Sequence, residues 1–207
     1  MKKYDCIIIG GGLSGLTLGI QLLKQNKKIL IVEKQDIRKY KKLCGGLLTK
    51  KSYDLLSSLI NIEDLNITKH NKSLFHNENQ HFYLDVEIYT MNRFELDNYM
   101  LNLYLELGGY ILSKTTYTHI DIEKSTITIK GEKYQYKNLV GADGVNSSLR
   151  KMITNRDQRK HFALEIEDNK KRDLEIYFSN SFKGYAWIIP NHKCSVIGMG
   201  EVTGRDN

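Results

Sequence analysis

The sequence predicts an α/β fold: a Rossmann-like βαβ domain with an antiparallel β-meander and an attached, incomplete antiparallel β domain. Three observations support this prediction. Residues 4–34 have the pattern of a strand, a glycine-rich loop, a helix and a second strand. Residues 117–136 alternate and turn as a meander does, and strand patterns dominate residues 161–201. We expect the first domain to comprise residues 1–60 and 90–155, and the second to comprise residues 61–89 and 156–207.

The glycine-rich loop has the spacing G-x-G-x-x-G, in the sequence Gly10-Gly11-Gly12-Leu13-Ser14-Gly15. Gly10 lets the preceding strand turn sharply, Gly12 lets the backbone approach a pyrophosphate, and Gly15 lets the helix pack closely on the strand. The helix N-terminus then offers free N–H groups and a positive dipole end to phosphates. A turn used only for packing is the alternative, but three consecutive glycines exceed what packing needs. We therefore expect a dinucleotide site.

The second strand, Ile29 to Val32, ends on Glu33, which lies 18 residues after Gly15. A carboxylate at this position accepts hydrogen bonds from both ribose hydroxyls. Because an acid here disfavours a 2′-phosphate, the sequence predicts the ADP moiety of FAD or NAD rather than NADP. Lys34 follows directly and is included in the predicted nucleotide site.

The formal charge of +7 is concentrated near the N-terminus, where residues 1–60 hold twelve Lys or Arg against four Asp or Glu. Such a face suits anionic cofactors or lipid head groups, and we expect contact with a membrane surface at most as a peripheral one. A solvated loop is the simpler explanation of these charges. No nucleic-acid module accompanies them, so we expect no nucleic-acid partner.

Several classes of protein are disfavoured by composition. No apolar run reaches the roughly 20 residues of a membrane span, and the N-terminus lacks the cleavage pattern of a signal peptide. We therefore expect a cytoplasmic protein. Cys6, Cys44 and Cys194 lie far apart, which favours reduced thiols over a disulfide framework. The six histidines show no ligand-like spacing, so we expect no metal.

The middle of the chain predicts a series of elements. Residues 50–60 read as a helix, whereas residues 61–80 are polar and irregular. Residues 81–89 alternate and predict one half-buried strand, with Phe82, Leu84, Val86 and Ile88 on one face. A helix is expected from Arg93 to Leu107, with Leu96, Met100, Leu103 and Leu107 as its core stripe and Gly108 as its stop. A short strand should begin at Ile111.

Two further segments carry chemistry. In Cys44-Gly45-Gly46 the adjacent glycines allow a close backbone approach to a flat ligand, although a free cysteine is more often a small buried hydrophobe. An apolar strand then ends on Gly141-Ala142-Asp143-Gly144, with Ser147 and Arg150 on the first turns of a helix. An ordinary strand–turn–helix capped by Asp143 or Asn146 is the alternative for this segment.

Taken together, three features resemble the FAD-dependent oxidoreductases of the p-hydroxybenzoate hydroxylase-like group. They are the fingerprint ending at Glu33, the Arg93-x-x-x-Asp97 helix, and the segment from Gly141 to Arg150. Within that group the chain is most similar to the geranylgeranyl reductase family. That family has a Cys-Gly-Gly after the second strand and a Tyr-x-Trp-x-x-Pro strand, which match residues 44–46 and 185–190.

The resemblance implies roles for particular residues. Gly10, Gly12, Leu13, Ser14, Gly15, Glu33 and Lys34 would hold the ADP half of FAD. Arg93 would lie along the cofactor, and Asp143 and Gly144 would support its pyrophosphate region. Cys44, Gly45 and Gly46 would lie near the flavin, with Cys44 the candidate catalytic residue, and Tyr185 and Trp187 would line the channel of an apolar, isoprenoid-type substrate.

The implied reaction is alkene reduction by reduced flavin, with NAD(P)H or a reduced protein as the electron donor. An aromatic monooxygenase and a truncated nucleotide-binding chain without turnover are the alternatives. The family also has a second flavin-contacting Gly-Asp-Ala-Ala-like turn, which does not occur after Gly200. We therefore expect a missing C-terminal segment and a flavin site that is complete only in its ADP half.

Overall fold

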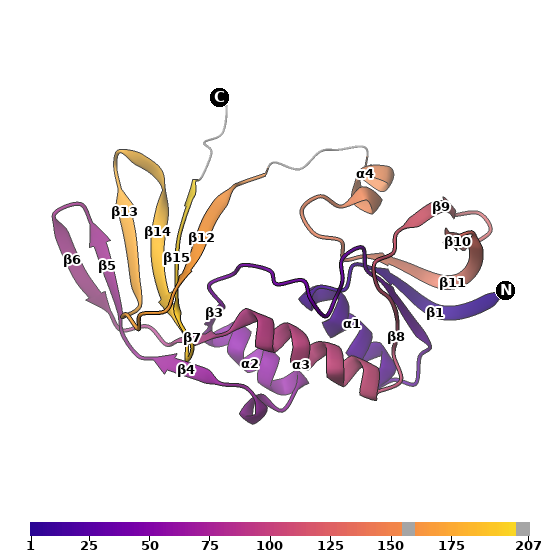
Figure 1. Ribbon diagram of the computed structural model, residues 1–207, viewed down its shortest axis with the longest axis horizontal. Coiled ribbons are helices and arrows are strands. Elements are labelled where there is room, and N and C mark those ends of the chain that lie inside the picture. Colours follow the sequence, from indigo (N-terminus) through magenta and orange to yellow (C-terminus); the bar gives the residue numbers. More distant parts are fainter. Residues whose placement is uncertain (155–159, 202–207) are drawn as a thin grey trace. The chain divides into compact units, whose positions relative to one another are not determined.

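The computed structural model describes residues 1–154 and 160–201 (Figure 1). The chain divides into two compact units. Unit 1 comprises Met1–Lys41 and Asp97–Gln158, and unit 2 comprises Lys42–Leu96 and Arg159–Asn207. Residues 42–60 and 90–96 therefore belong to unit 2, whereas the expected boundaries assign them to the nucleotide-binding domain. Which unit carries which function stays a prediction.

Unit 1 contains a six-stranded sheet in the order β8-β2-β1-β11-β10-β9. The pairs β1–β2, β1–β11 and β2–β8 are parallel, and β9, β10 and β11 form the antiparallel meander that the sequence predicts. The strands are β1 (Lys2–Ile9), β2 (Ile29–Val32), β8 (Tyr110–Leu112), β9 (Tyr117–Asp121), β10 (Thr126–Ile129) and β11 (Glu132–Gly141). The predicted α/β fold class is confirmed.

The helices of this part are α1 (Leu13–Leu23), α3 (Arg93–Glu106) and α4 (Ser148–Thr154). The first turn of α3 belongs to unit 2. On α3 the buried positions are Leu96, Met100, Leu101 and Tyr104, whereas Leu107 is 38% exposed. The expected core stripe is thus wrong at its last position, because the helix ends at Glu106 and Gly108 turns the chain with φ +84°.

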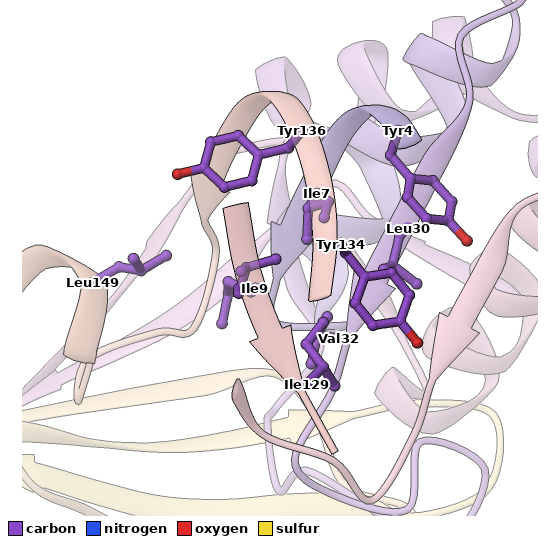
Figure 2. Packing of buried hydrophobic residues seen from close by; sticks show 10 residues of the cluster. Tyr4, Ile7, Ile9, Leu30, Val32, Ile129, Tyr134, Tyr136 and Leu149 are labelled. Atoms are coloured by element: carbon purple, nitrogen blue, oxygen red, sulfur yellow. The ribbon is translucent and has the colours of Figure 1, made fainter. Parts of the chain in front are cut away.

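Buried side chains cover both faces of the central strands, as in other parallel sheets. Ile8 and Ile31 face α1, where Cβ atoms placed on Gly15 and Gly19 would each lie 3.4 Å from them. The residues of β1 and β2 on the opposite face belong to a second cluster. Figure 2 shows this cluster packed against side chains of the meander and α4. This cluster includes Tyr4, Ile7, Ile9, Leu30, Val32, Ile127, Ile129, Tyr134, Tyr136 and Leu149.

Unit 2 contains two sheets. The larger has the order β12-β15-β14-β13-β5-β6, with β13 and β5 parallel and every other pair antiparallel. The smaller has the order β3-β7-β4. The strands of the two sheets are β3 (Leu47–Thr49), β4 (Ile67–His70), β5 (Ser73–Asn77), β6 (Gln80–Leu84), β7 (Ile88–Met91), β12 (Ala163–Asp168), β13 (Glu175–Ser179), β14 (Phe182–Pro190) and β15 (Ser195–Glu201).

The remaining helices of unit 2 are α2 (Lys50–Leu59) and the short 3-10 helix Ile62–Asp64. The side chain of Thr49 caps α2 by accepting a hydrogen bond from the Ser52 N–H. Leu174, Trp187 and Ile189 form a small buried cluster, against which Leu47 and Ile88 pack.

Two expectations for this unit are wrong. Residues 61–80 are not irregular, because they contain β4 and β5. Residues 81–89 are not one strand: β6 ends at Leu84 and β7 begins at Ile88, in a different sheet. The Val86 N–H donates to the Leu84 carbonyl at 3.0 Å, which marks a tight turn where the alternating pattern continues.

Across the described ranges 1–154 and 160–201, no helix combines the length and the apolar character needed to cross a bilayer.

Candidate functional site

The glycines of the fingerprint loop differ in what surrounds them. Gly10 has φ +107°, and a Cβ placed on it would lie 2.3 Å from the Ala142 carbonyl oxygen. A Cβ on Gly15 would lie 2.0 Å from the Gly10 carbonyl oxygen. A Cβ on Gly12 would meet nothing within 4 Å. Gly10 and Gly15 are therefore needed for backbone packing, whereas Gly12 leaves open space above the loop.

This open space lies at the N-terminus of α1. Gly12 is the N-cap residue, no side chain caps the helix, and its first turn contains no acidic residue. The first helical hydrogen bond runs from the Leu16 N–H to the Gly12 carbonyl at 2.9 Å. The N–H groups of Leu13, Ser14 and Gly15 precede that bond and have no partner in the helical ladder. These donors and the positive end of the helix dipole suit a phosphate group.

Glu33 is half-buried and holds two loops together. Its Oε2 accepts from the Gly11 N–H at 2.7 Å, and its Oε1 accepts from the Gln35 N–H at 2.7 Å. A carboxylate has about four lone-pair positions. Two acceptor positions therefore remain for ribose hydroxyls beside the fingerprint loop. Lys34 is exposed next to it.

The Asp143 segment joins the same place from the end of β11. The Ala142 N–H donates to the Ile9 carbonyl at 2.7 Å, and a Cβ on Gly10 would lie 2.8 Å from the Asp143 nitrogen. Asp143 Oδ2 accepts from the Ser148 N–H at 2.9 Å and thus caps α4. Its Oδ1 is buried and has no hydrogen-bond partner among the residues that the structure describes. Asp143 therefore acts as a helix cap and still has one free acceptor, while Gly144 turns the chain with φ +77°.

In unit 2, protein atoms surround the two glycines after Cys44. Gly46 has φ +70°, and a Cβ on it would lie 1.9 Å from the Met91 carbonyl oxygen. A Cβ on Gly45 would lie 2.4 Å from Ile189 Cδ1. The Gly45 N–H donates to Glu165 Oε1 at 3.2 Å. Packing inside unit 2 therefore explains Gly46 without any ligand, whereas at Gly45 the end of the Ile189 side chain could move aside.

Cys44 itself is half-buried. Its burial therefore does not decide between a residue near the flavin and a small buried hydrophobic residue. Its Sγ lies 3.9 Å from Arg93 Nη1, at the start of α3. The structure therefore brings the candidate catalytic thiol and the predicted cofactor-contacting guanidinium together.

Tyr185 and Trp187 project from the same face of β14, with ring centroids 5.2 Å apart. Tyr185 is 42% exposed, whereas Trp187 is only 8% exposed. The indole lies over Gly198 of β15, where a Cβ would be 2.5 Å from Trp187 Cε2. Trp187 Nε1 is buried and finds no hydrogen-bond partner within residues 1–154 and 160–201. Tyr185 is thus open to a ligand, and Trp187 mainly fills the space that Gly198 leaves.

Sequence reasoning missed Glu165 and Gly198. Glu165 lies 120 positions from Gly45, so no local pattern could reveal their contact. A signal for Gly198 was present, since a glycine inside a strand pattern often marks a close approach.

The predicted site residues fall into two groups. Unit 1 brings together the fingerprint loop, Glu33 and Asp143, and unit 2 brings together Cys44, Arg93 and the two glycines. The roles of these residues toward a cofactor or substrate remain predictions.

Comparison with known proteins gives a family. A family model described as FAD binding domain matches residues 3–193. An uncharacterised protein of Methanosarcina barkeri is 30% identical over 212 residues, which cover 96% of this chain and 54% of that protein. The chain spans about half the length of the curated relatives it matches.

Solved structures share the fold. A geranylgeranyl bacteriochlorophyll reductase-like protein from Thermoplasma acidophilum has a TM-score of 0.81 and 19% identity, covering 99% of this chain and 59% of that one. PqsL of P. aeruginosa, in complex with 2-aminobenzoylacetate, has a TM-score of 0.81 and 16% identity, covering 97% of this chain and 61% of that one.

Proposed function

Since the chain belongs to the FAD-binding domain family, whose model matches residues 3–193, we propose that it is a FAD-dependent oxidoreductase that reduces alkene bonds of an isoprenoid or related apolar substrate. FAD is the cofactor. The observation that carries FAD binding is the open space above Gly12, at an uncapped helix N-terminus beside a carboxylate with free acceptor positions. Alkene reduction is proposed from the likeness of residues 44–46 and 185–190 to the reductase motifs.

The residues of unit 1 fit the ADP half of FAD. The N–H groups of Leu13, Ser14 and Gly15 would bind the pyrophosphate, and Glu33 would accept hydrogen bonds from the ribose. Asp143 Oδ1 is a buried acceptor that no donor in the described part of the chain reaches. Because a carboxylate repels phosphate, this atom suits a hydroxyl of the cofactor close to the pyrophosphate.

When bound, FAD supplies the two-electron chemistry. The side chains of unit 2 would then handle substrate and proton. The exposed ring of Tyr185 offers an apolar wall, and the buried cluster with Trp187 excludes water beneath it. Cys44 is the candidate proton donor at Sγ, and Arg93 beside it would position the thiol and stabilise a thiolate left after proton transfer. NAD(P)H or a reduced protein would supply the electrons.

A FAD-dependent aromatic monooxygenase is the second candidate. It is supported by the likeness to PqsL, which has the same TM-score as the reductase-like protein and was solved with an aromatic ligand. A third candidate is a nucleotide-binding chain without turnover, because the chain spans about half of its curated relatives.

Product analysis separates these candidates. Mixed with an excess of FAD, the chain should show the visible absorption of bound oxidised flavin, and anaerobic incubation with an excess of reduced FAD and a prenyl alcohol should add two hydrogens to the alcohol. Oxygen-dependent hydroxylation of an aromatic compound would favour the monooxygenase instead. Flavin binding without formation of either product would favour the third candidate, a nucleotide-binding chain without turnover.

The nucleotide site has its own test. Glu33→Ala should weaken FAD binding about 10- to 100-fold, because charged hydrogen bonds to ribose contribute about 1.5–3 kcal/mol. Glu123→Ala is the control, since Glu123 is exposed in the turn between β9 and β10. Unchanged FAD affinity in Glu33→Ala would remove this residue from the site.

A further inference from the structure

A row of aromatic rings crosses four strands of the larger sheet in unit 2. Neighbouring ring centroids along the row are 5.2 Å, 6.1 Å, 6.2 Å and 5.8 Å apart. Figure 1 shows the four strands side by side, in the order β14, β13, β5 and β6. We call this row the aromatic strip; its members are Trp187, Tyr185, Phe178, Phe75 and Phe82.

The strand register places the whole strip on one face of the sheet. Tyr185 pairs with Phe178, and Phe75 pairs with Phe82. Ile176 connects the two pairs, because it lies opposite both Trp187 and Phe75. Since side chains alternate between faces, residues paired across strands share a face. The strip is therefore continuous with Tyr185, the residue proposed to form the substrate wall.

The strip is buried at Trp187, half-buried at Phe75 and exposed at its other three rings. Trp187 is 8% exposed, whereas Tyr185, Phe178 and Phe82 are 42%, 43% and 46% exposed. It crosses three inter-strand spacings, or about 14 Å. On its outer side the same face carries the exposed polar residues Asn77 and Gln80, which pair with each other. The exposed rings thus form a long, narrow apolar track with a polar border.

The size of this track argues against a protein partner. An aromatic side chain has about 150–250 Å² of surface, so the exposed parts of the strip total about 300 Å². A stable protein interface needs about 800 Å² on each partner. A single aromatic ring would cover only a part of the track. An extended apolar chain matches both its width and its length.

We propose that the aromatic strip binds the distal part of an extended isoprenoid chain, so that Phe75, Phe178 and Phe82 determine the chain length that the protein prefers. This inference rests on the proposed function, because that function supplies the isoprenoid substrate. Tyr185 would contact the part of the chain nearest the reacting bond, and Phe82 would contact the far end. Each added isoprene unit would bury further apolar surface until the strip is covered.

The test is a binding series with prenyl alcohols of two, three and four isoprene units, used below the concentrations at which they aggregate. The chain contains one tryptophan, so the fluorescence of Trp187 reports binding at the strip without a label. Each added unit should tighten binding about fivefold to tenfold. Phe82→Ala should weaken the four-unit alcohol about fivefold to tenfold and leave the two-unit alcohol unchanged.

Two controls keep this test specific. Tyr83→Ala removes an aromatic ring that is 65% exposed on the opposite face of the same strand, and it should leave the whole series unchanged. Phe82→Leu keeps an apolar side chain and should retain most of the chain-length preference. Thermal melting of each variant separates binding from the stabilisation that cross-strand aromatic pairs also give.

Several results would overturn the proposal. The first is that Phe82→Ala loses the same affinity for short and long alcohols. The second is that Tyr83→Ala weakens binding as much as Phe82→Ala does. The third is that Phe82→Ala lowers the melting temperature but leaves the affinities of the whole alcohol series unchanged. A Phe82→Ala variant that loses dimerisation or vesicle binding instead would assign the strip to a second copy or a membrane. Because the series is measured without FAD, absent flavin binding would refute the proposed function and leave this result standing.

Discussion

At the scale of single residues, the glycines separate into two kinds by what a methyl group would meet. Around Gly12 there is open space, and its φ of −71° suits any residue. Gly46 lies against the Met91 carbonyl with φ +70°. The first arrangement leaves room for a ligand, and the second fills the space with backbone. Substitution by alanine should therefore have opposite consequences at the two positions.

Gly12→Ala should leave the fold intact and weaken cofactor binding. The added methyl group meets no protein atom, so the free energy of unfolding should change by no more than about 0.5 kcal/mol. It would project where the pyrophosphate is proposed to lie, and FAD affinity should fall at least about tenfold. Thermal melting and FAD titration measure the two effects.

Gly46→Ala is the matched contrast. Its methyl group would meet a carbonyl oxygen that cannot move away cheaply, and its backbone conformation is strained for alanine, so we expect destabilisation of about 2 kcal/mol or more. Where unit 2 remains folded, FAD affinity at the nucleotide site of unit 1 should persist. A Gly12→Ala protein that melts as early as Gly46→Ala would contradict the distinction.

At the scale of elements, the sequence predicted those whose pattern is set locally. Helix α1, strand β2 and the meander lie where the glycine fingerprint and the turn residues predict them. The prediction of one strand over residues 81–89 was wrong, because an alternating pattern does not indicate which sheet a strand joins. Strand β6 is exposed at the edge of one sheet, whereas β7 lies between two strands of another.

Strand β15 offers a test of how Trp187 is held. Gly198→Ala would place a methyl group 2.5 Å from the indole ring, which must move. We expect the free energy of unfolding to fall by about 1–3 kcal/mol. The melting temperature should therefore be lower, and the fluorescence emission of Trp187 should shift to longer wavelength. Gly200→Ala is the control in the same strand, because its methyl group would make an ordinary contact of 3.5 Å. Equal behaviour of the two variants would contradict this packing.

The start of α3 should make unit 2 sensitive to acid. Burial alone would raise the pKa of Glu95, but Lys193 at 2.5 Å, His192 at 3.3 Å and a hydrogen bond with Asn66 together lower it below its ordinary value of 4.5. The unfolded chain therefore takes up the proton first as the pH falls. The stability from this contact is complete above about pH 4.5 and is lost as the pH falls through the lower, folded pKa.

Glu95→Gln should consequently be less stable than the native chain at neutral pH and show a shallower loss of stability as the pH falls below about 4.5. Denaturant unfolding followed by Trp187 fluorescence measures this loss in unit 2. Glu123→Gln is the control, because that carboxylate is exposed in a turn of unit 1. Parallel curves for the native chain and Glu95→Gln would show that this ion pair contributes no pH dependence.

The candidate site was predictable where it is local. The fingerprint and Glu33 occupy one βαβ unit, so their spacing alone predicts that the loop and the carboxylate lie together, as they do in the structure. The surroundings of the glycines after Cys44 could not be predicted from the sequence. The groups that they contact are the Met91 carbonyl of β7, the Ile189 side chain of β14 and the Glu165 carboxylate of β12. Only the folded sheet brings these distant segments to the loop.

At the scale of the whole molecule, the residues proposed to hold the ADP half of FAD belong to unit 1, and the chain spans about half of its curated relatives. We expect this chain to bind ADP within about tenfold of FAD, or about 1.4 kcal/mol. The shared contacts are the fingerprint loop, the helix N-terminus and Glu33. Calorimetric titration of both ligands measures the ratio, and FAD binding a thousandfold tighter than ADP would contradict it.

The position of β1 in its sheet also affects how the chain is made. One edge of β1 pairs with β2 soon after synthesis, but the other pairs with β11, and Gly141 follows its partner Ile9 by 132 residues. At 5–20 residues per second, ribosomes need about 7–26 s to cover that distance. During this time the edge of β1 that later pairs with β11 has no strand beside it, and its unpaired N–H and C=O groups can pair with another chain. We therefore expect a nascent chain of this protein to aggregate more readily before β11 has left the ribosome than after it.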